Sequence, residues 1–272
     1  MTSKIAVIGF GNIARAIITP LFDKKLLNPK DVYCLVNTKK SLENIRKNYK
    51  YDINIFQTKS KGSQIIWDCK VKFLSVKPQQ FNNIIELEKK NNNNNNNLLV
   101  SILAGVSLEK LIKRFPNHEC VRVVTNIPIT IGKGLTGISW GDEITKEQKQ
   151  FIKTLFENSS KIYEFPEDLL DIFLSVTSSG PAIIALIIEA LSDGGLSGGL
   201  QKKLSEELIV EMILGTVSLI KETNVTTAEL KNMVTSPGGT TISALRVLEN
   251  RSLRSALIEA VVSASNRSKE FR

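Results

Sequence analysis

The stretch Ile5–Ala14, IAVIGFGNIA, decides how the first part of the chain folds. The apolar run IAVI predicts a buried strand, and the letters GFGNIA that follow have the G-x-G-x-x-(G/A) spacing of a turn between a strand and a helix. In such a turn Gly9 permits the tight reversal, Gly11 lets the backbone approach a pyrophosphate, and Ala14 keeps the helix close to the sheet. The stretch therefore predicts a Rossmann-type dinucleotide-binding domain with phosphates at the helix N-terminus.

Strand and helix patterns alternate through the first part of the chain and give way to helices alone afterwards. Such alternation is typical of an open α/β sheet. We expect a Rossmann-type domain over residues 1–165, with a solvated asparagine-rich loop at 89–97, and an all-α domain over 166–272. The expected strands are Lys4–Ile8, Val32–Val36, Ile53–Phe56, Val71–Val76, Leu98–Ile102, Val121–Thr125 and Lys161–Glu164, and the expected helices among them are Asn12–Phe22, Ser41–Asn48 and Lys146–Phe156.

Composition limits the possible function classes. The net charge of +9 comes from scattered Lys and Arg, without a basic stripe between aromatics, so no nucleic-acid partner is expected. The three cysteines are widely separated, and no Cys/His cluster suggests a metal site. The uninterrupted apolar stretch Ala182–Ile188 is too short for a membrane span, and the start of the chain lacks signal-peptide features, so a cytoplasmic protein is expected. The single histidine, His118, is in a turn-like segment and is expected at the surface, not in catalysis.

The residues after the second expected strand indicate the cofactor. Proteins that bind NAD usually carry Asp or Glu there for the ribose hydroxyls, whereas this chain reads Asn37-Thr38-Lys39-Lys40. Asn37, Thr38 and Lys39 are candidates to bind a 2′-phosphate, so NADPH is the expected cofactor, with NADH as a possible substitute. Alternatively, the two lysines are only a solvated helix entry.

A second glycine-containing turn, Ser236–Thr241, precedes an amphipathic helix. Unpaired N–H groups at a helix start favour an anion such as a carboxylate. An ordinary helix cap, with Thr240 or Thr241 as the capping residue, fits the same residues equally well. Upstream, the segment Ala182–Leu191 is apolar on nearly every face, which predicts that a second chain covers it.

The segment TSPGGTTISALRVLE, residues 235–249, resembles the signature of the pyrroline-5-carboxylate reductases. Further motifs extend the resemblance along most of the chain outside the asparagine run: GFGNIA, FLSVKPQ at 73–79, SILAG at 101–105, SGPA at 179–182, EALSDGG at 189–195 and RSALIEA at 254–260. The resemblance implies a Rossmann domain and a helical domain that interlocks with a partner chain as a homodimer or larger homo-oligomer. It also implies NAD(P)H-dependent reduction of 1-pyrroline-5-carboxylate to L-proline, the last step of proline biosynthesis.

The resemblance also implies residue roles. The residues expected to bind the cofactor are Gly9, Phe10, Gly11, Asn12, Ile13, Ala14, Asn37, Thr38, Lys39, Val76, Lys77, Pro78, Ala104 and Gly105. The residues expected to bind the substrate are Glu167, Ser236, Gly239, Thr240 and Thr241, with Thr241 as hydrogen-bond partner or proton donor to the imine nitrogen. The chain departs from the family pattern at VTNIP (124–128), at TSSGP (177–181) and at Met233, which affects the lining of the site more than the reaction class.

Two other functions remain as alternatives. A β-hydroxyacid-dehydrogenase-like oxidoreductase would need a catalytic lysine on a helix that faces the cofactor, and Lys202, Lys203 and Lys221 are poor candidates. A non-catalytic NADPH-binding sensor would have no need of the hydroxyl-rich turn Ser236–Thr241.

Overall fold

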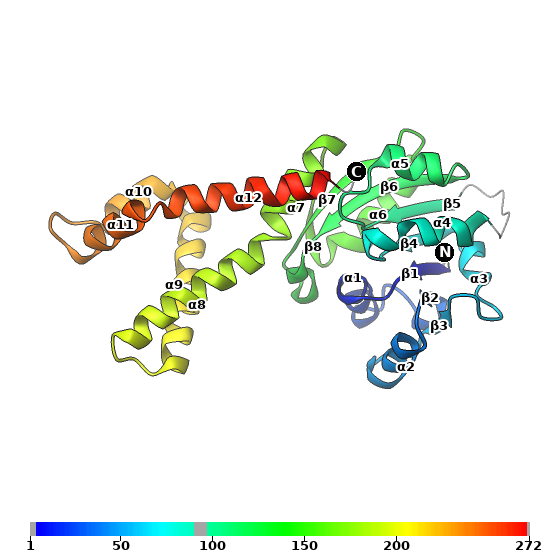
Figure 1. Cartoon of the computed structure of the whole chain (residues 1–272), viewed down its shortest axis with the longest axis horizontal. Coiled ribbons are helices and arrows are strands. Elements are labelled where there is room, and N and C mark those ends of the chain that lie inside the picture. Colours follow the sequence, from blue (N-terminus) through cyan, green and yellow to red (C-terminus); the bar gives the residue numbers. More distant parts are fainter. Residues whose placement is uncertain (1–3, 90–96, 271–272) are drawn as a thin grey trace. The chain divides into compact units, whose positions relative to one another are not determined.

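The computed structural model describes residues 4–89 and 97–270 (Figure 1). The chain divides into two compact units, one made of Met1–Ser178 with Ala264–Arg272 and one made of Ser179–Ser263. The boundary expected from sequence, after residue 165, lies before the division at Ser178, and the C-terminal residues return to the first unit. Lys89 ends a helix and Asn97 begins a strand, whereas the rest of the expected asparagine-rich loop, 90–96, lies outside the described residues.

The first unit contains a sheet that has eight strands within the described residues, in the order β3-β2-β1-β4-β5-β6-β7-β8. Every neighbouring pair is parallel except β6 with β7. The order reverses between β1 and β4, where open α/β sheets bind their ligands at the carboxyl ends of the strands. The strands are β1 (Ile5–Ile8), β2 (Val32–Val36), β3 (Asn54–Gln57), β4 (Val71–Leu74), β5 (Asn97–Ser101), β6 (His118–Thr125), β7 (Gly134–Trp140) and β8 (Ser160–Glu164).

Apolar side chains cover both faces of this sheet, as parallel sheets require. Ile5 and Val7 of β1 belong to one buried cluster, and Ala6 and Ile8, which point the other way, belong to a second. Helices α1 and α6 contribute to the first cluster, and α3, α4 and α5 contribute to the second. The bounds are α1 (Asn12–Asp23), α2 (Lys39–Asn48), α3 (Ile65–Asp68), α4 (Phe81–Lys89), α5 (Leu108–Arg114), α6 (Lys146–Glu157) and α7 (Leu170–Thr177), with short 3-10 turns η1 (Pro29–Asp31), η2 (Pro78–Gln80), η3 (Ile127–Ile131) and η4 (Glu167–Leu169).

The sequence patterns gave no indication of strand β7. Its segment, GLTGISW, contains two glycines, which weaken a strand pattern. A Cβ at Gly137 would lie 2.8 Å from the Phe173 ring, and one at Gly134 would lie 2.8 Å from the Cβ atoms of Ile129 and Ser160. These glycines allow η3, α7 and β8 to pack closely against β7.

The prediction that His118 lies at the surface is wrong. His118 is the first residue of β6, is buried, and its ring centroid lies 5.7 Å from that of Phe115. Burial, with a smaller effect of the Lys72 charge, lowers the pKa of His118 to about 4. The imidazole is therefore neutral at pH 7, and it does not line the nucleotide pocket described below.

A buried ion network joins distant parts of the first unit. The Arg122 Nη2 atom on β6 lies 2.8 Å from Asp171 Oδ1 on α7, and both side chains are fully buried. The Ser268 hydroxyl, near the end of α12 (Leu253–Lys269), donates a 2.8 Å hydrogen bond to the same carboxylate oxygen. The network therefore anchors the C-terminal end of α12 to the first unit.

The second unit consists of helices: α8 (Gly180–Ser197), α9 (Lys202–Thr223), α10 (Thr227–Met233), α11 (Thr240–Asn250) and most of α12. Helices α8 and α9 pack closely, because the buried Ser205 hydroxyl donates to the Ser192 carbonyl at 2.7 Å and leaves no space for a Cβ at Gly195. Apart from Ser192 and Ser205, the residues described in this unit are exposed or half-buried. The helical run Glu167–Ser197 is long and apolar enough to span a membrane: an 18-residue stretch within it has a mean hydropathy of 1.8, and 11% of that stretch is buried.

Candidate nucleotide and substrate sites

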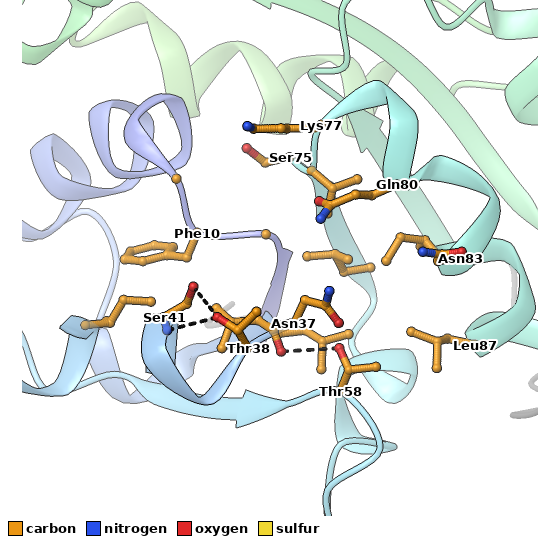
Figure 2. Close-up of a pocket in the computed structure, with 18 of the residues that line it drawn as sticks. Phe10, Asn37, Thr38, Ser41, Thr58, Ser75, Lys77, Gln80, Asn83 and Leu87 are labelled. Carbon is orange, nitrogen blue, oxygen red and sulfur yellow. Dashed lines mark hydrogen bonds between the residues drawn. The ribbon is translucent and has the colours of Figure 1, made fainter. Parts of the chain in front are cut away.

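A cavity of about 410 Å³ opens at the carboxyl ends of β1, β2 and β4, where the strand order reverses (Figure 2). Its walls come from the turn after β1, from the start of α2, and from the loop and helices after β4. The lining residues are Ile8, Gly9, Phe10, Gly11, Arg15, Leu35, Val36, Asn37, Thr38, Ser41, Asn44, Ile45, Thr58, Ser75, Val76, Lys77, Gln80, Asn83, Ile84 and Leu87.

Gly9 is fixed by its backbone conformation and by its surroundings. Its φ of +88° lies in the region that favours glycine, and a Cβ there would lie 2.5 Å from the Ser75 carbonyl oxygen. The Gly9 N–H also donates to the Leu35 carbonyl at 2.9 Å. Gly9 thereby brings the turn after β1 against both neighbouring strand ends.

The surroundings of Gly11 are open, in contrast to the close packing around Gly9. It is the N-cap residue of α1 in an extended conformation, and no atom lies within 4 Å of the position that a Cβ would take. No side chain caps this helix and no acid lies in its first turn, so its N-terminal N–H groups are available to an anion. The free space beside Gly11 is where a pyrophosphate would approach the backbone.

The wall at the end of β2 is polar, and its described lining residues include no acid. Thr38 caps α2, because its Oγ1 accepts the Ser41 N–H at 3.1 Å and donates to the Ser41 hydroxyl at 2.8 Å, and Thr58 Oγ1 donates to the Val36 carbonyl at 3.2 Å (Figure 2). Among the described residues that line the cavity, the ionisable ones are Arg15 and Lys77. A 2′-phosphate in this cavity would therefore meet no carboxylate among these described residues.

Several predicted cofactor residues do not line the cavity. Lys39 is 81% exposed and lies 3.8 Å from Glu43, so the positive charge of the pocket comes from elsewhere. Ala14 is buried in the apolar cluster beneath α1, as expected of the residue that keeps this helix close to the sheet. The other predicted residues outside the lining are Asn12, Ile13, Pro78, Ala104 and Gly105.

Other lining residues were not predicted from the sequence. Arg15 directly follows Ala14, and its position after the glycine motif was the available signal. Ser41, Asn44, Thr58, Gln80 and Asn83 are polar residues whose approach to the cavity depends on how separate elements pack.

Glu167, expected near the substrate, takes part in contacts within the first unit. Its Oε1 atom accepts the Leu108 N–H at the start of α5 at 2.7 Å and lies 3.0 Å from Arg122 Nη1. These bonds join η4 to α5 and β6. Glu167 belongs to the first unit, whereas the other expected substrate residues, Ser236, Gly239, Thr240 and Thr241, belong to the second.

The turn Ser236–Thr241 has the geometry of an open helix start. Gly238 has a φ of +69°, and the Gly239 N–H donates to the Ser236 carbonyl at 3.0 Å. Helix α11 begins at Thr240 with Gly239 as its N-cap residue, with no side chain capping it and no acid in its first turn. The alternative prediction, that Thr240 or Thr241 caps the helix, is therefore wrong. Thr241 is half-buried and Thr240 is exposed.

Comparison with known proteins identifies the family of the chain. Residues 167–271 match the family model for pyrroline-5-carboxylate reductase dimerisation, and residues 4–105 match the model for NADP oxidoreductase, coenzyme F420-dependent. A pyrroline-5-carboxylate reductase of Synechocystis is 37% identical over 100% of this chain and 99% of its own length. The chain belongs to the pyrroline-5-carboxylate reductase family.

Solved structures agree with this family assignment. A pyrroline-5-carboxylate reductase from Coxiella burnetii is 30% identical and aligns with a TM-score of 0.79 over 100% of this chain and 99% of that one. The Plasmodium falciparum reductase, solved with NADP bound, shares the fold with a TM-score of 0.86 at 24% identity, over 99% and 98% of the two chains.

Membership of the family explains the exposed apolar helices. The match to a dimerisation model spans the second unit and the whole run Glu167–Ser197, so a partner chain, not lipid, is the expected cover for this reductase-family helix. It also argues against the β-hydroxyacid dehydrogenase alternative. Lys202, Lys203 and Lys221 are exposed residues of α9.

Proposed function

We propose that this chain reduces 1-pyrroline-5-carboxylate to L-proline with NADPH, the last step of proline biosynthesis. The main support for the proposal is the 37% identity to a pyrroline-5-carboxylate reductase over 100% of this chain and 99% of that protein. NADH is the alternative hydride donor. The cavity supports NADPH, because its described lining residues include no carboxylate that would repel a 2′-phosphate.

The cavity fits a dinucleotide by its own geometry, and bound NADPH supplies the hydride. The open start of α1, at Gly11, Asn12 and Ile13, binds the pyrophosphate, and the space beside Gly11 accommodates it. Asn37 and Thr38 contact the adenosine ribose end. The other predicted residues, Val76, Lys77, Pro78, Ala104 and Gly105, surround the nicotinamide ribose; of these, Val76 and Lys77 line the cavity.

The start of α11 supplies the substrate site in this proposal. Its first-turn N–H groups, with the hydroxyl of Ser236, hold the substrate carboxylate, which suits the uncapped and acid-free helix start. The Thr241 hydroxyl oxygen accepts a hydrogen bond from the protonated ring nitrogen, and Glu167 lies near the substrate. A protonated cyclic imine is already electrophilic at carbon, so the main contribution of the protein is to hold that carbon about 3 to 3.5 Å from the hydride donor.

The active form in this proposal is a homodimer, or a larger homo-oligomer built from it. The second unit exposes large apolar side chains on α8 and α9, among them Leu186, Leu208, Met212, Leu214 and Val217. Burial of such surface is the main driving force for association. A cytoplasmic location follows from the kind of biosynthetic step and is part of the proposal.

The test is to incubate the purified protein with NADPH and pyrroline-5-carboxylate and to follow the absorbance of NADPH. Oxidation of NADPH that requires the imine, with formation of proline, supports the proposal. A sensor would bind NADPH without turnover. A β-hydroxyacid dehydrogenase would instead reduce NADP⁺ in the presence of a hydroxyacid, and either of these results would contradict the proposal.

A further inference from the structure

Arg15 has a place in the nucleotide pocket that the glycine motif alone does not explain. It lies on α1, one residue after Ala14, and it lines the cavity together with Thr38, Ser41 and Asn44. Alanine at position 14 has a packing role in the motif, whereas nothing in the strand–turn–helix geometry requires a cation at position 15. The charge of Arg15 is therefore a feature of this pocket that needs its own explanation.

Two aromatic rings hold the Arg15 guanidinium in place. Its Cζ atom lies 5.7 Å from the centroid of Phe10 and 5.9 Å from that of Tyr49, within the range of a cation–π contact. The two rings meet edge to face at 5.0 Å, and the Tyr49 hydroxyl pairs with the Thr19 hydroxyl at 2.9 Å. The Arg15 Nε–H donates to the Phe10 carbonyl at 3.4 Å, a bond that uses Nε and not the two Nη groups.

The other cation of the lining lies elsewhere. In Figure 2, Phe10 lies toward Thr38 and Ser41, at the end of β2, whereas Lys77 lies beside Ser75 and away from them. Lys39, which follows Thr38 in sequence, is outside the lining and lies close to Glu43. Arg15 is therefore the charged residue best placed to act at the ribose end of the pocket.

We propose that Arg15 determines the preference for NADPH by binding the 2′-phosphate across the cavity from Thr38 and Ser41. This inference rests on the proposed use of NADPH. A guanidinium presents paired N–H donors that match phosphate oxygens, and one that is held on aromatic rings loses less freedom on binding. No carboxylate among the described lining residues competes for it. NADH has a hydroxyl at the same position and gains little from the charge.

The test measures dissociation constants of NADPH and NADH from the purified full-length protein by coenzyme fluorescence, without imine substrate. In Arg15→Gln the Kd for NADPH is expected to rise about 10- to 100-fold, because a charge-assisted bond is lost, while the Kd for NADH changes less than about twofold. Arg15→Lys keeps a cation near both rings and is expected to lose less NADPH affinity than Arg15→Gln. Arg46→Gln removes an exposed arginine of α2 outside the lining, and is expected to change neither constant.

Three results would overturn the inference: an unchanged Kd for NADPH in Arg15→Gln, an equal loss for both coenzymes, or a loss of NADPH preference in Lys39→Gln and not in Arg15→Gln. The equal loss would mean that Arg15 only supports the fold of the pocket. Because binding is measured without the imine, failure of the proposed reductase activity is a separate result. A protein that fails to reduce the imine but binds NADPH in an Arg15-dependent way would contradict the function and support this inference.

Discussion

Gly9 and Gly11 occupy neighbouring positions of one motif, yet alanine at each should damage a different property. Alanine at position 9 must adopt a φ of +88°, which costs about 1–2 kcal/mol. Its Cβ would also lie 2.5 Å from the Ser75 carbonyl oxygen, a backbone atom that can move only with the loop after β4. Overpacking of this kind costs about 1–3 kcal/mol. Gly9→Ala should therefore lower the free energy of unfolding by about 2–5 kcal/mol.

Gly11→Ala should leave the fold nearly intact and impair cofactor binding. Gly11 has an extended conformation that alanine tolerates, and its Cβ would meet no atom of the protein, so the expected loss of stability is about 1 kcal/mol or less. The same methyl group would occupy the space proposed for the pyrophosphate. Loss of charge-assisted N–H contacts there should raise the Kd for NADPH about 10- to 100-fold.

The assay combines chemical unfolding of the cofactor-free protein with NADPH binding followed by fluorescence. Gly132→Ala is the matched control, because Gly132 has a φ of +74° with no atom within 4 Å of the Cβ position. It isolates the conformational cost, so it should lose about 1–2 kcal/mol and retain NADPH affinity. Equal stability of Gly9→Ala and Gly132→Ala, or normal NADPH binding by Gly11→Ala, would refute this account of the turn.

Three further predictions concern catalysis and stability. Thr241→Ala should lower kcat for imine reduction about 10- to 100-fold with an unchanged unfolding midpoint, because the hydrogen bond with the ring nitrogen is lost. Thr241→Ser keeps the hydroxyl and should retain most of the activity. Equal rates in the unchanged protein and in both variants would contradict the role of Thr241. The pKa of His118 is about 4 in the folded protein and about 6.5 in the unfolded chain, so the buried neutral imidazole contributes stability above pH 6.5. This contribution, up to about 3 kcal/mol, is lost as the pH falls toward 4. Urea unfolding of His118→Phe should therefore show a shallower decline of stability over this pH range, and a decline identical to that of the unchanged protein would contradict the burial of a neutral His118. Asp171→Ala should lower the free energy of unfolding by about 3–5 kcal/mol, because it leaves Arg122 buried without this carboxylate. Glu249→Gln, at the exposed pair with Arg254, should lower it by less than about 1 kcal/mol. Similar unfolding curves for the two variants would show that the buried network contributes little to stability.

Local rules account for the parts of the fold that the sequence predicted. The turn at Gly9–Ala14 is specified by its own residues, because a positive φ and a close approach to the next strand both require glycine at position 9. The sequence of helix α8 also predicted that another chain covers it, because its apolar residues lie on nearly every face of the helix. The cofactor class followed from the missing acid after β2.

Other features depend on long-range packing and could not be predicted. The burial of His118 is set by Phe115 and by neighbouring strands, not by the turn-like letters around it. Strand β7 is hidden because Gly134 and Gly137 serve contacts with partners distant in sequence. The Arg15 guanidinium lies near the rings of both Phe10 and Tyr49, and its approach to Tyr49, which is distant in sequence, could not be predicted from the glycine motif.

Hydride transfer from NADPH to the imine carbon can be followed by isotope transfer. The purified protein is supplied with NADPH carrying two deuterium atoms at C4 of the nicotinamide ring and with unlabelled pyrroline-5-carboxylate, and the proline formed is analysed by mass spectrometry. We expect L-proline with one deuterium at C5 for each NADPH oxidised. Proline without deuterium, or NADPH oxidation without proline, would contradict it.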